Sequence, residues 1–331
     1  MNKFLVVLLF AFISCEVELD NIIFKQFQKF IKKYNKKYES INEYLARYEV
    51  FKRNVMATFE NEDLPYKTGI TKFSDLTKQE FAKTYLNLNY DAMAMANFEP
   101  TYVKVSNAAP ASYDWRNYNR VAPVKDQGSC GSCWAFATVA NLESLYALKK
   151  GVVKTFSEQL LVDCDTEDSG CNGGLMELSF EWLKNNGGFM LESDYPYENK
   201  KGTCRQDKSK FVDMKVTGYV KLGDTGEQYA PVDEAEVKEF LYQNGPLAVA
   251  LNATPLQLYF GGIVDWASWI CSTSGINHAV TIVGYGTESK DYWIVKNSWG
   301  KNWGESGYFR IARGKSTCGI NYYVTTATVE F

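Results

Sequence analysis

The stretch from Gln127 to Ala137 constrains the fold of this chain more than any other. It reads Gln-Gly-Ser-Cys-Gly-Ser-Cys-Trp-Ala-Phe-Ala, a turn of glycine and serine followed directly by good helix formers. This pattern predicts a helix from about Trp134 to Leu148, with Cys133 at its beginning. The unpaired N–H groups and positive dipole end of a helix favour a thiolate over a thiol, and the thiolate is the nucleophile. The sequence therefore predicts a fold built around one activated cysteine.

The chain has eight cysteines, and its beginning indicates that they pass through an oxidising compartment. Lys3 is followed by an apolar run from Phe4 to Ile13, which is too short to span a bilayer and is typical of a secretory signal. We expect a signal peptide over residues 1–15, which includes Cys15 and leaves seven cysteines. An odd number leaves one thiol free or paired with another molecule, and the other six allow about 15 pairings.

Composition limits the classes of protein to which this chain can belong. With 331 residues, the chain can bury a large core and form about two domains. Hydrophobic residues make up 46% of the chain and charged residues 23%, which is typical of a globular protein, and the formal net charge is -3. A chain without an excess of basic residues offers no surface for nucleic acid. After the first residues, no stretch is long and apolar enough for a membrane helix.

Two amphipathic helices are expected in the first sixty residues. Large apolar residues recur at intervals of three and four from Leu19 to Tyr38 and again from Ile41 to Phe59. On the second segment, Glu43 and Arg47 have the spacing of an ion pair on one helix face. A loose stretch of small residues from Val105 to Ala111 then separates this helical region from the rest of the chain.

The remainder of the chain changes character near Phe211. Before it, a short helix is expected over Ser157 to Cys164, with Ser157 as its N-cap, and another helix over Leu175 to Leu183. After it, runs of Val, Ile, Tyr and Phe between glycine turns predict strands. These strands are Ala248 to Leu251, Ala279 to Tyr285, Tyr292 to Lys296 and Tyr308 to Ala312. A helical half is therefore followed by a half that we interpret as an antiparallel barrel.

His278 is the only histidine in the chain. A single histidine excludes a metal site made of several histidines and places all acid-base capacity near neutral pH in one side chain. His278 begins the apolar strand, so its side chain can face a cleft between the helical half and the barrel. We interpret it as catalytic and expect no bound metal and no cofactor.

Three motifs, in order along the chain, resemble those of the papain-like cysteine proteases, and of cathepsin L-like precursors in particular. Cys130 to Trp134 is similar to the active-site signature of that family. Asn277-His278-Ala279 follows, with His278 145 residues after Cys133, and Asn297-Ser-Trp-Gly begins 19 residues beyond His278. The spacing of Cys, His and Asn is that of the family.

The region before Ala109 also resembles part of a cathepsin L-like precursor. Four residues match the beginning of the E-R-F-N-I-N propeptide pattern: Glu43, Arg47, Phe51 and Asn54. The pattern then departs, with Thr58 at a usually apolar position and Asn61 one place early. Gly69 to Asp75 is similar to the G-x-N-x-F-x-D element, with Thr71 in place of Asn, and Ala109 to Arg116 resembles the beginning of a mature papain-like enzyme.

The resemblance implies an α+β fold and a secreted zymogen. The papain-like fold has two subdomains, a helical one and an antiparallel β-barrel, preceded by an inhibitory helical propeptide. The implied segments are the signal peptide at 1–15, the propeptide at 16–108 and the peptidase domain at 109–331, with the helical half at about 116–212 and the barrel half at about 213–331. The active site lies in the cleft between the halves.

The resemblance also assigns roles to individual residues. Cys133 and His278 form a thiolate-imidazolium pair that cleaves peptide bonds, Asn297 orients the imidazole, and the Gln127 amide and Cys133 N–H stabilise the oxyanion. Trp299 and Trp303 shield the bond between His278 and Asn297 from water. The implied substrate-binding residues are Gly173, Gly174, Leu175, Met176, Ala250, Ile276, Ala279, Trp299 and Tyr323. The implied disulfides are Cys130 with Cys171, Cys164 with Cys204, and Cys271 with Cys318.

Expectations about partners and compartment follow from the same resemblance. The expected partners are polypeptide substrates with an apolar residue two before the cut, the protein's own propeptide and cystatin-like inhibitors. We expect the protein to be a monomer and to act in an acidic, lysosome-like compartment or outside the cell. Residues 16–108 hold 14 basic and 13 acidic residues, against 21 and 26 in residues 109–331. The two parts therefore carry opposite net charges and attract each other weakly. Because acid protonates carboxylates, we predict that it releases the propeptide from the peptidase domain, with Asp75 and Glu43 as the candidate groups. Asn252-Ala-Thr is the one possible N-glycosylation site.

Two other functions fit parts of the sequence. Cys130-Gly-Ser-Cys133 has the C-x-x-C spacing of thiol-disulfide oxidoreductases, a reading that gives His278 and Asn297 no role. The second alternative is a papain-like protein that binds polypeptides without cleaving them. The presence of Cys133, His278, Asn297 and Gln127 argues against this alternative. Titration of the thiols separates a protease, with one reactive thiol, from a redox protein, with two or none.

Overall fold

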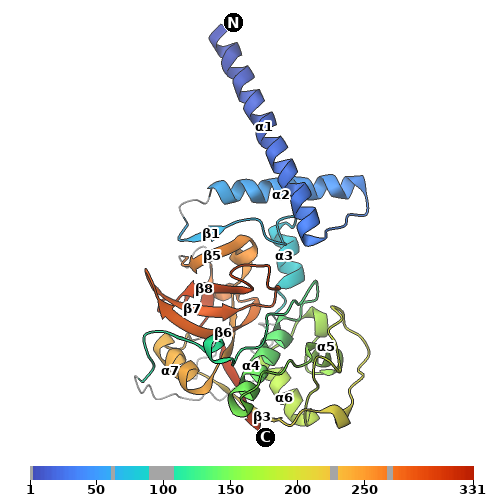
Figure 1. The fold of residues 1–331 in the computed structure, drawn as a ribbon, viewed down its shortest axis with the longest axis vertical. Helices are drawn as coiled ribbons and strands as arrows, with labels where there is room; N and C mark the ends of the chain where they lie inside the picture. The colour runs from blue at the N-terminus through green and yellow to red at the C-terminus, as the bar shows by residue number, and fades with distance from the viewer. Residues whose placement is uncertain (1–2, 61–63, 89–107, 224–229, 267–270) are drawn as a thin grey trace.

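The computed structural model describes residues 3–60, 64–88, 108–223, 230–266 and 271–331, with nearly all side chains from residue 18 onward (Figure 1). The helices are α1 (Lys3–Tyr34), α2 (Ile41–Glu60), α3 (Lys78–Tyr85), α4 (Cys133–Lys150), α5 (Glu158–Cys164), α6 (Met176–Asn186) and α7 (Glu234–Asn244). The strands are β1 (Tyr66–Thr68), β2 (Tyr113–Asp114), β3 (Lys215–Lys221), β4 (Leu247–Leu251), β5 (Tyr259–Val264), β6 (His278–Thr287), β7 (Asp291–Lys296), β8 (Tyr308–Ala312) and β9 (Val324–Glu330).

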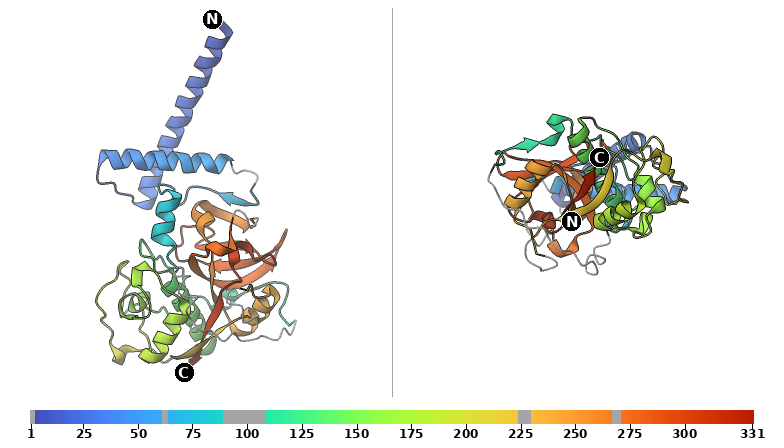
Figure 2. Two further views of the ribbon diagram at one scale, coloured as in Figure 1. Left: turned by 180° about the vertical axis from the view of Figure 1, so that it is seen from behind. Right: turned by 90° about the horizontal axis from the view of Figure 1, so that it is seen from below.

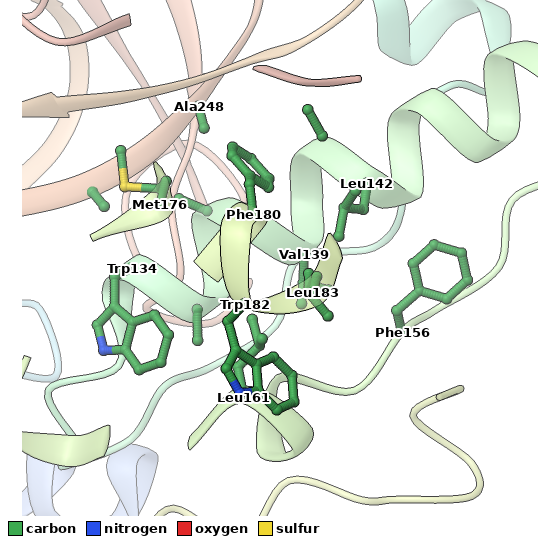
Figure 3. Packing of buried hydrophobic residues seen from close by; sticks show 14 of the residues in the cluster. Trp134, Val139, Leu142, Phe156, Leu161, Met176, Phe180, Trp182, Leu183 and Ala248 are labelled. Carbon is green, nitrogen blue, oxygen red and sulfur yellow. The ribbon is translucent and has the colours of Figure 1, made fainter. Parts of the chain in front are cut away.

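Helix α4 is the central element, and it begins at Cys133 as the sequence predicts. It ends at Gly151, whose left-handed conformation suits glycine at a helix C-terminus. Figure 3 shows Val139 and Leu142 on one side of α4, within the core that α4 shares with α5 and α6. The predicted cap of α5 is also confirmed, because the Ser157 side chain accepts a hydrogen bond from Leu160 N–H. Local sequence signals thus account for the helical half.

The strands of the described residues form one sheet in the order β1-β5-β8-β7-β6-β4-β9-β3, with β2 paired to β6. The four predicted strands correspond to β4, β6, β7 and β8, whereas β3, β5, β9 and helix α7 were not anticipated. All strand pairs are antiparallel except β5 and β8, which run parallel, so the expectation of a purely antiparallel barrel is wrong at this pair. Strand β6 starts at His278, and its neighbour Ala279 lies opposite Ala250 of β4.

Helices α1 and α2 cross at the end of the molecule remote from the C-terminus (Figure 1). The predicted helix over Leu19 to Tyr38 lies in α1 as far as Tyr34, where α1 ends before Asn35 with its positive φ of 49°, so the expected last four residues are not helical. At its other end α1 is continuous from Lys3. Aromatic side chains, among them Phe27, Phe30 and Phe51, form a separate small core between α1 and α2. This pair of helices is therefore a unit with its own core.

Contacts around α2 differ in part from the sequence expectation. Arg47 does not pair with Glu43, which instead accepts a hydrogen bond from the N–H of Glu39. Arg47 binds Glu80 of α3 at 2.9 Å and the Asp75 carbonyl at 3.1 Å, because α3 packs below α2. The Asp75 carboxylate accepts from Lys36 at 2.7 Å and from Tyr38 at 3.0 Å. Of the propeptide pattern, Asn61 lies outside the described residues, as do residues 105–107 of the loose stretch.

The segment after α2 adds to the sheet of the larger body. Strand β1 pairs antiparallel with β5 at the sheet edge, and both lie between α2 and the barrel in opposite views (Figures 1 and 2). Helix α3 begins with a capping box, in which the Thr77 side chain and Glu80 satisfy each other's backbone N–H groups. Phe73 and Phe81 belong to the barrel's hydrophobic core although they precede it by more than a hundred residues. The N-terminal region is therefore integrated with the barrel.

Three disulfides join the pairs that the family resemblance implies: Cys130 with Cys171, Cys164 with Cys204, and Cys271 with Cys318. Cys133 is the free cysteine among the described residues. The oxidoreductase reading requires Cys130 and Cys133 to pair with one another, and the bond from Cys130 to Cys171 is not compatible with it. No helix of the described residues is long and apolar enough to cross a bilayer.

Candidate active site

Cys133 is fully buried at the N-terminus of α4. Burial raises the pKa of its thiol to about 11, although backbone N–H groups of Ala279, Trp134 and Asn87 act in the opposite direction. A low dielectric disfavours the thiolate more than the helix N-terminus favours it here. The predicted activation of the thiol is therefore not expressed in this conformation of the chain.

The imidazole of His278 is held on two sides. Its Nε2 is 2.9 Å from Oδ1 of Asn297, and its ring stacks on Trp299 with a centroid distance of 4.7 Å. Trp299 in turn meets Trp303 edge to face at 4.7 Å. His278, Trp299 and Trp303 are almost completely buried, so water is excluded from the bond between His278 and Asn297, as the sequence predicts. Because Nε2 faces Asn297, Nδ1 is the ring nitrogen left for another partner.

Burial lowers the pKa of His278 to about 4, against the opposite effects of the hydrogen bond to Asn297 and of the Tyr85 backbone. A raised thiol pKa and a lowered imidazole pKa both disfavour the charged forms. Burial in this conformation therefore acts against the predicted thiolate-imidazolium pair, because water that would solvate the two charges is excluded.

Gln127 is buried beside Cys133, as predicted, and it makes contacts that the sequence could not show. Its Nε2 donates to the Cys130 carbonyl at 3.1 Å and to the Tyr85 carbonyl at 3.3 Å. Its Oε1 accepts from the Ser298 hydroxyl at 2.7 Å. The amide that would stabilise an oxyanion thus already donates to a carbonyl oxygen of the N-terminal region.

Residues 85–88 run along the cleft that the site residues line. Leu88 forms a parallel bridge with Gly174, and its N–H donates to the Asn277 carbonyl at 3.1 Å. The segment at Leu88 therefore pairs with the backbone at Gly174, in the way that is expected of a substrate. Here the segment comes from the protein's own N-terminal region.

The close approach of this segment depends on glycine. Gly173 has a φ of +116°, and a Cβ there would lie 2.2 Å from the carbonyl oxygen of Asn87. A Cβ on Gly131 would lie 2.4 Å from Nδ2 of the same Asn87. A side chain at Gly173 would therefore displace a backbone that lies in this place, and one at Gly131 would displace the Asn87 side chain or the Cys171 carbonyl.

The remaining predicted substrate-binding residues all lie in the interior. Cys133 shares one hydrophobic cluster with the side chains predicted for the pocket, namely Leu175, Met176, Ala250, Ile276, Ala279 and Tyr323. Figure 3 shows Met176 between the first turn of α6 and the sheet. The Tyr323 hydroxyl has no hydrogen-bond partner among the described residues, and the Lys221 ammonium lies 5.2 Å from the Tyr323 ring centroid. The cluster is thus apolar except at Tyr323.

The structure adds two residues that sequence reasoning missed. Ser298 holds the Gln127 side chain and stands within the Asn297-Ser-Trp-Gly motif, which was the available signal. Lys72 of the N-terminal region binds both oxygens of Asp126 at 2.7 Å, next to Gln127, and no local pattern indicates this pair. Both contacts fix the loop that carries Gln127.

Two other sequence features have no support as binding sites. Within the described ranges, no group of three or more His, Cys, Asp and Glu side chains could hold a metal ion. Asn252, the possible glycosylation site, is only 9% exposed, and its Nδ2 donates to the Ser272 carbonyl at 3.1 Å. This fold leaves no room for a glycan at Asn252.

The chain matches two described families. Residues 109–328 match the papain family cysteine protease, and residues 27–81 match the cathepsin propeptide inhibitor domain. The propeptide match contains all of α2 and the beginning of α3. The protease match contains every site residue that the sequence predicted.

Relatives and solved structures agree with these matches. Cysteine proteinase 15A of Pisum sativum is 40% identical over 319 residues, which cover 91% of this chain and 85% of the relative. Digestive procathepsin L2 proteinase from the larval midgut of Tenebrio molitor has a TM-score of 0.83 and 34% identity, covering 92% of this chain and 99% of that one. The recombinant stem bromelain precursor has a TM-score of 0.82 and 35% identity, covering 93% and 99%.

The raised thiol pKa predicts slow alkylation of Cys133 in the intact chain. A rise from the ordinary value of 9.0 to about 11 reduces the thiolate fraction at pH 7 by about 100-fold. We expect iodoacetamide to label the intact chain at least that much more slowly than the urea-unfolded chain, with the Cys133→Ser chain as a blank. Equal rates in the folded and unfolded chains would show that the thiol is not shielded.

Proposed function

The chain belongs to the papain family of cysteine proteases, and on that premise we propose that it matures into an endopeptidase in which Cys133 is the nucleophile and His278 the proton carrier. The observation that carries the proposal is the 2.9 Å contact of His278 with Asn297, in the same buried site as Cys133 at the head of α4. This arrangement leaves Nδ1 of His278 as the nitrogen that takes the thiol proton.

The proposed reaction begins when residues 85–88 leave the cleft. Water and substrate then solvate the site, so the thiol pKa falls, the imidazole pKa rises and the proton moves from Sγ of Cys133 to Nδ1 of His278. The thiolate attacks the peptide carbonyl, and His278 gives its proton to the leaving amine. A water molecule, deprotonated by His278, then hydrolyses the thioester and restores the free thiol.

Asn297 and Gln127 have supporting roles in this proposal. Asn297 accepts the Nε2–H bond and so stabilises the imidazolium without the negative charge of an Asp. The Gln127 amide and the Cys133 N–H stabilise the oxyanion, and support comes from the bond of Gln127 Nε2 to the Tyr85 carbonyl, which is a neutral stand-in for that oxygen. Ser298 orients the Gln127 amide by binding Oε1.

The proposal extends to processing and location. We propose that residues 1–15 are a signal peptide, that residues 16–108 are an inhibitory propeptide and that the mature monomer begins near Ala109. The enzyme would act on polypeptides in a lysosome-like compartment or outside the cell and be open to cystatin-like inhibitors. Support for inhibition in cis comes from residues 85–88, which lie where a substrate backbone would pair with Gly174.

Substitutions at the proposed catalytic residues test the function directly. Cys133→Ser and His278→Ala should each reduce kcat by at least about 1000-fold while the precursor stays folded and unprocessed. Asn297→Ala should leave measurable residual activity, because it orients the imidazole without taking the proton. The assay is peptide hydrolysis by acid-treated precursor, with far-ultraviolet circular dichroism as the control for folding. Wild-type turnover in Cys133→Ser would exclude the mechanism.

The proposed pocket for the second residue before the cut predicts a preference for bulky apolar side chains. Its lining is apolar apart from the Tyr323 hydroxyl, and an unpaired charge would be costly to bury there. A peptide library varied at that position should give kcat/KM values about 10- to 100-fold higher for Leu, Val or Phe than for Asp or Lys. A dominant acidic or basic residue would show that these side chains do not form the pocket.

Acid release of the propeptide has a structural candidate in Glu80. Burial raises its pKa, but hydrogen bonds from Thr77 and Arg47 outweigh burial and hold the pKa below the ordinary 4.5. Glu80 therefore stabilises the docked α3 above its unfolded pKa, and this stability is lost as the pH falls through the lower folded pKa. Asp20, whose pKa is lowered by Lys52 and Tyr48, acts in the same direction between α1 and α2.

We predict that Glu80→Gln weakens the pH control of processing. The glutamine keeps the capping box but loses the charge that binds Arg47, so the precursor should process about two- to fivefold faster at pH 7. Processing at a pH low enough to protonate Glu80 in the wild type should change less. Glu49→Gln, a matched change at an exposed position of α2, is the control. An unchanged pH profile in Glu80→Gln would remove Glu80 from the mechanism.

A further inference from the structure

A cluster of buried charges lies behind the candidate active site. Glu143, on α4 ten residues after Cys133, is almost completely buried. Its Oε1 is 2.8 Å from Nζ of Lys125, and its Oε2 is 3.8 Å from Nζ of Lys296. The Lys125 ammonium also contacts Glu158 at 2.8 Å. Two lysines from different segments therefore meet one carboxylate of the central helix.

The two lysines belong to the segments that carry the proposed catalytic amides. Lys296 precedes Asn297 directly, and Lys125 is two residues before Gln127. The segments are joined by two backbone hydrogen bonds, one of 2.8 Å from the Gln127 N–H to the Ser298 carbonyl and one of 3.0 Å from the Gly300 N–H to the Lys125 carbonyl. A shift of either lysine is thus transmitted to both catalytic amides.

A cavity of about 20 Å³ is shared by the charge cluster and the site. Its lining includes Lys125, Glu143 and Lys296 of the cluster together with Asn297 and Ser298. This volume accommodates about one water molecule. Among the described residues, Oε2 of Glu143 and Nδ2 of Asn297 have no hydrogen-bond partner. The walls of this cavity therefore offer a water molecule one polar group of the cluster, Oε2 of Glu143, and one of the site, Nδ2 of Asn297.

Asn297 depends on its surroundings for its position. Its Oδ1 is shared by Nε2 of His278 and by the N–H of Ser298, and its own N–H donates to the Gly307 carbonyl at 3.0 Å. Its Nδ2 makes no hydrogen bond to the described residues, so only the Oδ1 end of the side-chain amide is fixed by the protein. The placement of the backbone after Lys296 therefore decides how well Oδ1 meets His278.

We propose that Glu143 is a positioning residue for the reaction, because its carboxylate holds Lys125 and Lys296 together and so fixes Asn297 and Gln127 relative to Cys133. The inference rests on the proposed function. Without the negative charge of Glu143, two ammonium groups face each other in the interior, and unpaired buried charges are strongly unfavourable. The segments that carry them would separate, and the bond of Asn297 to His278 would lengthen.

The other charges around Glu143 do not replace it. Burial raises the pKa of Glu158 to about 8, with Lys125 opposing and Glu143 adding to the rise, so Glu158 does not offset both lysines at acid pH. Burial also lowers the pKa of Lys296, against the effect of Glu143. Glu192 lies 3.8 Å from Lys125 on the far side of the cluster and is partly exposed.

The first test compares two buried carboxylates. Glu143→Gln should lower kcat of the mature enzyme about tenfold with KM within about twofold of wild type. The basic limb of the kcat/KM profile should move to lower pH by about half a unit, because the hydrogen bond that His278 Nε2–H donates to Asn297 favours the imidazolium and would be weakened. Glu177→Gln, a change at a fully buried glutamate on α6 outside the cluster, is the matched control and should leave the pH profile unchanged.

The second test is rescue of the charge balance. Glu143→Gln combined with Lys296→Met removes the facing ammonium groups, so kcat and the basic limb should return to within about threefold and about 0.2 units of wild type. If Glu143 only stabilises the fold, the double variant should be no more active than Glu143→Gln. That result, or a single variant with a lower Tm but unchanged kcat and pH profile, would overturn the inference. The double variant also serves if Glu143→Gln fails to fold.

A double-mutant cycle with Asn297→Ala identifies the route. If Glu143 acts through Asn297, Glu143→Gln should reduce kcat by less than about twofold when Asn297 is already Ala. Additive losses would overturn the inference while leaving the catalytic proposal intact. A lack of effect of Asn297→Ala and Cys133→Ser alone would instead contradict the proposed function.

Discussion

The exclusion of water from Cys133 and His278 is the interaction on which the rest of the structure depends. Burial raises the thiol pKa to about 11 and lowers the imidazole pKa to about 4, so it disfavours the charge separation that a nucleophilic thiolate needs. Residues 85–88 lie over the site, where Leu88 pairs with Gly174 and the Tyr85 carbonyl accepts from Gln127. Gly173 allows the backbone of Asn87 to lie so close.

The same segment belongs to a region that is joined to the rest of the molecule by noncovalent contacts. Helices α1 and α2 share a small aromatic core, while β1, Phe73 and Phe81 continue the sheet and core of the barrel. Ion pairs such as Arg47 with Glu80 connect the two parts of the N-terminal region. The three disulfides all lie after residue 109, which is the physical basis for the proposal that acid loosens the N-terminal region first.

Helix α4 joins the chemistry of the two halves. Its first residue is the thiol, and Glu143 on its third turn meets lysines from the segments that carry Gln127 and Asn297. The hydroxyl of Ser298 and the backbone bonds between the two segments complete the connection. The site is therefore assembled from a helix, the first residue of strand β6 and two loops, and buried polar contacts lie behind the proposed catalytic groups.

The sequence by itself determined the elements whose signals are local and the residues that bear unusual chemistry. Cys133 at the head of a helix, the Ser157 cap and the strand that begins at His278 depend on a few neighbouring residues, and they appear as predicted. The only histidine and the spacing of Cys133, His278 and Asn297 were likewise readable. The tertiary structure alone decided the partner of Arg47, the parallel pairing of β5 and β8, the bond of Ser298 to Gln127 and the burial that raises the pKa of the thiol. These depend on which distant segments meet and how much water they exclude, and such information is spread over the whole chain.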